Sequence, residues 1–177
     1  MDRNSKLKGL AAVAISILLT LSILYFNPAA MLKGSIGGLG YFGIFLIMLI
    51  SNATIILPAP GLLAVFAAGS SYNIVLVGIA AGLGGALGES TGYLLGYGGE
   101  EMLGLKGKMY GRVKKWMQSH GFITLVVLSA IPNPAFDVAG IAAGSLKYPW
   151  PRFFAACAIG ISIKAVLFAY LGYSLMG

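Results

Sequence analysis

Three ionisable side chains, those of Glu89, Asp137 and Lys164, lie inside long apolar stretches of this sequence. In a membrane such charges are costly unless they are paired or used, and they commonly mark transport pathways and proton relays. Two roles for Asp137 remain open. It can stabilise the positive end of a helix dipole, or it can titrate in a wet cavity and couple proton movement to a substrate. Glu89 and Lys164 are predicted to form a structural pair, because opposite charges relieve each other's desolvation.

Asp137 follows a break in the helical pattern. In Ile131-Pro132-Asn133-Pro134, two prolines within three residues remove two backbone donors and disfavour helix in the residues before them. A second helix can then begin, with Asn133 as its N-cap and Pro134 in its first position. The earlier stretch Pro58-Ala59-Pro60-Gly61 repeats this pattern. In lipid, the open backbone of both breaks must face protein or a wet cavity, and its free N–H groups can bind an anion such as a lipid phosphate.

These features together predict a transport site that contains the two breaks and the three intramembrane charges. We expect a substrate headgroup to pass between the breaks. The predicted site residues are Asn52, Pro58, Pro60, Gly61, Glu89, Pro132, Asn133, Pro134, Asp137 and Lys164.

The composition is that of a membrane protein. Hydrophobic residues make up 58% of the 177 residues, charged residues make up 10%, and the mean hydropathy is +0.89. This predicts one integral membrane domain over residues 1–177. The net charge of +7 comes from flanks and one connector, a placement that indicates membrane topology and not nucleic-acid binding. One cysteine and one histidine cannot form a His/Cys metal cluster. Because no hydrolase, metalloprotease or phosphate-loop motif is present, we expect neither an enzyme nor a cofactor.

The apolar segments predict an all-α integral membrane fold. Residues 9–27 follow a basic arm and are just long enough to span a bilayer, and we expect a retained helix, with a signal peptide as the alternative. The segments that follow are a broken hairpin over 40–70, a transmembrane helix over 72–98, a basic amphipathic helix over 100–119, a second broken hairpin over 121–147 and a transmembrane helix over 150–176.

The basic connector combines cations with an apolar stripe. Met109, Val113, Trp116 and Met117 recur at helical spacing. This pattern predicts an interfacial helix among lipid headgroups, with Trp116 at the boundary. A solvated basic connector is the alternative. The predicted headgroup-facing residues are Lys106, Lys108, Arg112, Lys114, Lys115 and Trp116.

The second half of the chain repeats the first. When the two proline breaks are aligned, Ala67-Ala68-Gly69-Ser70 falls on Ala142-Ala143-Gly144-Ser145, and Leu95-Gly96-Tyr97 falls on Leu171-Gly172-Tyr173. The glycines at positions 84, 88, 92 and 96 line one helix face, which allows another helix to approach closely. In the same alignment, the position of Glu89 falls close to that of Lys164, so the two equivalent helices carry opposite charges.

The distribution of cations orients the two halves. If both broken segments crossed the bilayer fully, the basic connector and a cytoplasmic N-terminus would lie on opposite sides, against the positive-inside rule. We therefore predict three full crossings and two re-entrant hairpins. The hairpins enter from opposite sides, which makes the halves an inverted repeat of the kind that many transporters use.

These residues resemble the DedA family, also called the VTT-domain or SNARE-associated Golgi protein family, over residues 41–173. The resemblance rests on Pro58-Ala59-Pro60-Gly61, on the run from Gly88 to Tyr97, and on the run from Ile131 through Lys147. It implies opposed re-entrant hairpins and lipid scrambling or flipping. Proton-coupled bacterial members carry acids where this chain has Asn52 and Leu62. They carry arginines where it has Ser129 and Ala135, so passive scrambling, or coupling through Asp137 alone, fits this chain better.

The sequence therefore predicts a phospholipid scramblase or flippase. A non-transporting membrane scaffold and a carrier of small ions or osmolytes are the alternatives. The expected partners are membrane lipids, including anionic phospholipids or lipid-linked phosphates, and a homo-oligomer is compatible with the sequence. The expected location is the cell membrane, with several crossings and a cytoplasmic N-terminus.

Overall fold

The computed structural model describes residues 38–53, 60–98, 108–133 and 135–176. The regular secondary structure of these residues is entirely helical, which confirms the all-α prediction for the described part of the chain. The expected helix over 9–27, Pro58, Lys106 and Pro134 lie outside the described residues. The helices are α3 (Gly40–Ala53), α4 (Pro60–Gly69), α5 (Ile74–Gly98), α6 (Lys108–Ala130), α7 (Ala135–Ser145) and α8 (Trp150–Met176).

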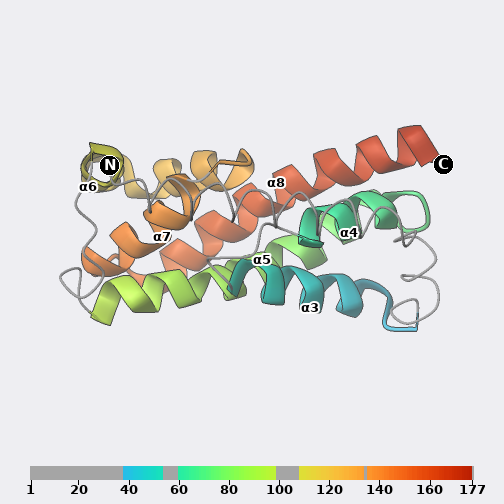
Figure 1. Cartoon of the computed structure of the whole chain (residues 1–177), viewed down its shortest axis with the longest axis horizontal. Helices are drawn as coiled ribbons and strands as arrows, with labels where there is room; N and C mark the ends of the chain where they lie inside the picture. The colour runs from blue at the N-terminus through green and yellow to red at the C-terminus, as the bar shows by residue number, and fades with distance from the viewer. Residues whose placement is uncertain (1–37, 54–59, 99–107, 134, 177) are drawn as a thin grey trace, which may run out of the picture.

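Two long antiparallel helices, α5 and α8, run through the centre of the molecule (Figure 1). With 25 and 27 residues, they are about 37 and 40 Å long, enough to cross a hydrocarbon core of about 30 Å. Both are also apolar enough to do so. Gly78 and Gly82 of α5 lie directly against Ser162 of α8, so small residues let the two backbones approach closely.

The first hairpin consists of α3 and α4, which run antiparallel. At its open end, the rings of Tyr41 and Tyr72 meet edge to face with centroids 5.4 Å apart. The backbone N–H of Asn73 also donates to the Tyr41 hydroxyl at this end, at 3.2 Å. At its tip, Gly61 of α4 lies against Ser51 of α3. The chain therefore enters and leaves this hairpin at one end of the molecule.

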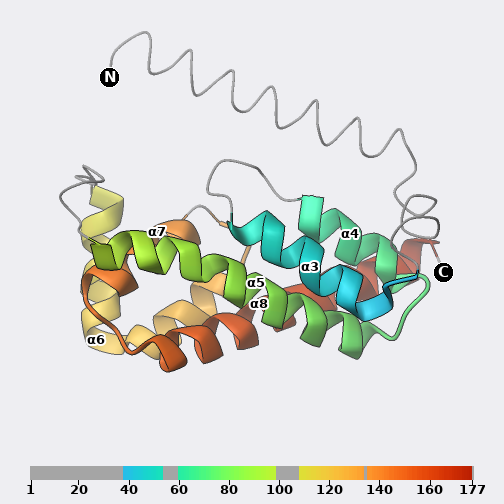
Figure 2. The ribbon, with the colours of Figure 1, turned by 90° about the horizontal axis from the view of Figure 1, so that it is seen from below.

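The second hairpin consists of the later part of α6 and of α7, and it opens at the opposite end (Figures 1 and 2). Gly121 lies against the ring of Tyr148 at its open end, and its tip is the segment between Ala130 and Ala135. The α3, α4 and α7 helices have 14, 10 and 11 residues. They are therefore about 21, 15 and 16 Å long, and each is too short to cross a bilayer.

Helix α6 is interrupted at His120, whose φ and ψ of −143° and 53° are not helical. The Thr124 hydroxyl donates to the Trp116 carbonyl across this kink, at 3.3 Å. The sequence places the boundary between the basic helix and the second hairpin at the same point. The basic part packs on the core through buried Tyr110, whose hydroxyl is 2.9 Å from the Ser145 Oγ at the end of α7.

Each hairpin has two arms, which are its two helical segments, and the two arms of one hairpin pack on different long helices. Helix α3 packs on α5 of its own half, whereas α4 packs on α8. In the same way, the second half packs α6 on its own α8 and α7 on α5. Each long helix therefore carries one arm from each hairpin.

Close contacts at glycines recur at equivalent positions in the two halves, so the packing of α7 on α5 repeats that of α4 on α8. In α5 and α7, a Cβ on Gly96 would overlap the Ile141 carbonyl, and one on Gly144 would overlap the Tyr93 carbonyl. In α8 and α4, Gly172 and Gly69 have the same reciprocal relation with the carbonyls of Phe66 and Ala169. Gly144 follows Gly69 by 75 residues and Gly172 follows Gly96 by 76, the same spacing as in the aligned sequence.

Candidate functional site

The tips of both hairpins reach the turn of α5 that carries Glu89. The end of α3 lies on one side of it, where the Thr91 hydroxyl donates to the Ala53 carbonyl at 3.2 Å. Helix α7 lies on the other side, where an ideal Cβ on Gly140, in the middle of α7, would be 3.5 Å from the Glu89 Oε1. Asp137 in the first turn of α7 contributes to the electrostatic field at Glu89. The structure thus places segments from both proline breaks around one carboxylate.

Glu89 and Lys164 are buried polar side chains, exposed to only 5% and 7%. Glu89 lies 15 residues after the first residue of α5 and 9 before its last. Lys164 lies 14 residues after the first residue of α8 and 12 before its last. Both charges therefore lie in the inner part of a long helix, as the alignment of the two halves predicts.

The charges of Glu89, Asp137 and Lys164 act on one another. Both Asp137 and Lys164 contribute to the electrostatic field at Glu89, with opposite signs. The Lys164 ammonium lies 5.5 Å from the centroid of the Phe136 ring, within range of a cation–π interaction. Within the described residues, no direct ion pair joins Lys164 to either carboxylate. The side chains form a loose cluster of two acids and one base.

Asp137 differs from the other two charges because it is exposed. It lies in the first turn of α7, where the positive end of the helix dipole stabilises a carboxylate. Its neighbour Phe136 is buried and exposed to only 4%. The side chain is thus both a first-turn acid and an accessible carboxylate beside the buried charges, and both predicted roles remain open.

Asn133 closes the helix that arrives at the second tip. Its Nδ2 donates to the carbonyls of Leu128 and Ile131, at 2.9 and 2.8 Å. The prediction that its side chain caps α7 is therefore wrong. Only its backbone carbonyl contributes there, by accepting from the Phe136 N–H at 3.3 Å. The Asn133 Oδ1 is buried without a hydrogen-bond partner in the described residues, so the tip keeps one unused acceptor.

The first tip is built in a related way. Asn52 donates from Nδ2 to the Met48 carbonyl at 2.8 Å, and the same nitrogen would be 3.3 Å from a Cβ on Gly85. Gly61 is the second residue of the returning helix α4, and a Cβ there would be 2.9 Å from the Ser51 Oγ. Pro60 is the first residue of α4. In the second tip, Pro132 is exposed.

The predicted headgroup-facing residues lie on the basic part of α6. Lys108, Arg112, Lys115 and Trp116 are exposed, whereas Val113 is buried. Lys114 is half-buried and its Nζ lies 5.6 Å from the centroid of the Tyr110 ring. Of the apolar stripe, Val113 and Met117 therefore pack on the protein, whereas Met109 and Trp116 are exposed together with Lys108, Arg112 and Lys115.

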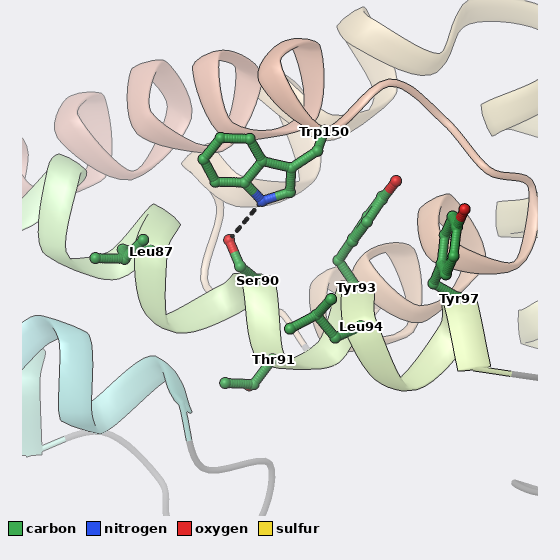
Figure 3. A pocket seen from close by; sticks show the side chains of 7 residues that line it. All are labelled: Leu87, Ser90, Thr91, Tyr93, Leu94, Tyr97 and Trp150. Carbon is green, nitrogen blue, oxygen red and sulfur yellow. Dashed lines mark hydrogen bonds between the residues drawn. The ribbon is translucent and has the colours of Figure 1, made fainter.

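An apolar groove that no sequence pattern indicates lies on the outer face of α5. It is bounded by α5 and by the first turn of α8 (Figure 3). Its walls include Ser90 and Trp150, joined by a hydrogen bond of 3.1 Å. These two residues are 60 positions apart in the sequence, so only the packing of the two halves brings them together.

A family model and several known proteins resemble this chain over part of its length. The model of the VTT domain matches residues 57–174. Vacuole membrane protein KMS1 of Arabidopsis thaliana is 35% identical over 112 residues, which are 51% of this chain and 27% of the relative. Vacuole membrane protein KMS2 of the same plant is 35% identical over 100 residues, 46% of this chain and 24% of the relative.

A shorter match connects the chain to animal proteins. Vacuole membrane protein 1 of Homo sapiens is 43% identical over 51 residues, 29% of this chain and 13% of the relative. The chain therefore matches about a quarter or less of the length of these curated relatives. No solved structure gives a significant match.

Proposed function

Because this chain belongs to the VTT-domain family of membrane proteins, we propose that it moves phospholipids between the two leaflets of a bilayer. In this proposal the headgroup passes between the tips of the two hairpins while the acyl chains remain in lipid. One observation carries it. Two short hairpins open at opposite ends of the molecule and both reach the buried charge at Glu89.

In the proposed membrane arrangement, α5 and α8 cross the bilayer and both hairpins are re-entrant. The short lengths of α4 and α7 support this arrangement, because neither helix reaches across a hydrocarbon core of about 30 Å. The end of the molecule that carries the basic part of α6, Lys147 and Arg152 would face the cytoplasm. The cell membrane and the cytoplasmic N-terminus remain predictions from the sequence, and the relatives are named for vacuole membranes.

In our proposal the cluster of Glu89, Asp137 and Lys164 supplies polar partners for a headgroup at the centre of a bilayer. A phosphate in hydrocarbon is costly unless it finds polar partners. In our proposal the Lys164 ammonium attracts the phosphate as it passes. Glu89 and Asp137 limit how long it stays, since a site with compensating charge binds an anion less tightly than a lone cation. Passive movement needs such weak binding, because tight binding would hold the lipid at the centre.

Reconstitution tests the proposal. Purified protein in liposomes with a fluorescent phospholipid in both leaflets is treated with dithionite, a membrane-impermeant quencher. We expect bleaching to proceed beyond the outer-leaflet fraction, and Glu89→Gln to change the rate. Gln118→Ala, a change at an exposed residue of α6 outside the predicted sites, is the control and should leave the rate unaltered. Bleaching that stops at the outer-leaflet fraction with folded protein would contradict the proposal, and solute flux without lipid exchange would indicate a carrier.

The role of Asp137 is tested in the same assay. If Asp137 titrates during transport, Asp137→Asn should change the dependence of lipid movement on pH as well as its rate. If the carboxylate serves only the α7 dipole, the pH profile should keep its shape, and the loss should appear as lower stability of about 0.3–1 kcal/mol.

A further inference from the structure

A preformed apolar groove lies on the outer face of the molecule at its basic end. Its volume is about 630 Å³, and it is lined by Leu87, Ser90, Thr91, Tyr93, Leu94, Tyr97 and Trp150 (Figure 3). That size is within the range of roughly 300 to 1,000 Å³ of small-molecule sites. From this groove and its charged surroundings, we infer that the molecule binds one anionic phospholipid, with an acyl chain against α5 and the phosphate at the start of α8.

The walls of the groove are held in place by contacts of their own. The Trp150 ring is fixed by its bond to the Ser90 Oγ and by the ring of Phe154, whose centroid is 5.4 Å away. The Tyr93 hydroxyl donates to the Tyr148 carbonyl at 2.6 Å, and the Tyr93 ring lies 5.0 Å from that of Phe153. Because both aromatic walls are anchored, the space persists without an occupant, and a ligand need not order it.

The chemistry of the lining fits a hydrocarbon chain. The polar groups of Ser90, Tyr93 and Trp150 are already bonded within the protein. What faces the groove is therefore mainly carbon, including the exposed side chains of Leu87 and Leu94. Such a lining discriminates weakly among apolar ligands, so the groove alone selects a chain and not a headgroup.

The headgroup is selected by charge at one end of the groove. Trp150 begins α8, and the exposed cations Lys147 and Arg152 flank it in the sequence. The basic part of α6 is joined to the same end by the contact between Tyr110 and Ser145. Every cation of the described residues except Lys164 belongs to this end, whereas the two described acids are Glu89 in the inner part of α5 and Asp137 in the first turn of α7. The wall of the groove at Trp150 therefore belongs to the positive end of the molecule, which fits a phosphate with net negative charge.

Tryptophan fluorescence provides the test, because the chain has only two tryptophans. In Trp116→Phe, the full-length protein reports from Trp150 alone. We expect bilayers with brominated phosphatidylglycerol to quench Trp150 more strongly than bilayers with brominated phosphatidylcholine, with a preference of about fivefold in relative binding constant. The preference should fall in high salt and in Lys147→Gln/Arg152→Gln.

A matched control separates this site from general contact with lipid. In Trp116→Phe/Trp150→Phe/Leu76→Trp, the single tryptophan lies on the exposed face of α5 at its other end. Both brominated lipids should quench it equally. A second variant, Leu94→Phe, narrows the groove and should reduce the quenching of Trp150 by both brominated lipids without removing any cation. A preference at Trp150 no larger than at Leu76→Trp would overturn the inference.

Absence of quenching at Trp150 by both brominated lipids would also contradict the inference. If neither brominated lipid quenches Trp150, protein occupies the groove. The occupant would then be the apolar segment over residues 10–26 or a second copy of the chain, and the lipid inference would fail. This test measures binding alone, so its result is independent of whether the protein moves lipids.

Discussion

Replacing Gly96 by alanine tests whether close contact between α5 and α7 positions the second hairpin. A Cβ at Gly96 would overlap the Ile141 carbonyl oxygen and lie only 2.7 Å from its carbon. These are backbone atoms, so no side-chain rotation can relieve the overlap, and α7 must move away from α5. Overpacking of this kind costs about 1–3 kcal/mol. Alanine regains up to about 1 kcal/mol of helix propensity over glycine, which leaves a net loss of up to about 2 kcal/mol when that gain is complete.

Gly92 provides the control on the same helix. It is buried, but no atom of the described residues lies within 4 Å of an ideal Cβ there. Gly92→Ala should therefore keep the gain in helix propensity of up to about 1 kcal/mol. Thermal unfolding in detergent, followed by circular dichroism, should show Gly96→Ala melting up to about 8 °C below the parent protein and clearly below Gly92→Ala. Equal melting temperatures for Gly96→Ala and Gly92→Ala would refute the packing argument.

Three further predictions follow from the repeat and from the hairpins. Gly172→Ala should lower the melting temperature by about as much as Gly96→Ala, because the equivalent overlap forms between α8 and α4, and a loss confined to one variant would contradict the symmetry. Tyr110→Phe removes the hydrogen bond between α6 and the end of α7, which should cost about 0.5–1.5 kcal/mol in chemical unfolding. Single cysteines at Leu39 and Ser71, in a Cys157→Ala background, should react with a membrane-impermeant reagent from the same side of sealed vesicles. Labelling from opposite sides would exclude a re-entrant first hairpin.

Local chemistry in the sequence was enough to predict most of the helix boundaries. Proline and glycine interrupt the backbone pattern wherever they occur, so the breaks near Gly61 and Asn133 could be located without knowing the fold. The aligned repeat also anticipated that Glu89 and Lys164 would occupy comparable positions in α5 and α8. The glycine face was predicted correctly for Gly84, Gly88 and Gly96, where a Cβ would meet another backbone.

The features that the sequence could not provide depend on which elements pack together. Gly92 has the spacing of its neighbours, but the described structure places no atom against it. The Asn133 side chain lies between the end of α6 and the start of α7 and could bond to either. It donates to carbonyls at the end of α6. The groove at Trp150 exists because α8 begins beside Ser90, and no local pattern records that proximity.

The packing of one hairpin's two arms on different long helices has a consequence for biosynthesis. Helix α4 rests on α8, and the ribosome makes α8 only after the whole second hairpin. Until then, the first hairpin lacks the surface that covers its returning arm. We therefore expect membrane insertion machinery or a chaperone to shelter α4 during that interval, and we expect quality control to recognise a stalled or truncated product that ends before α8.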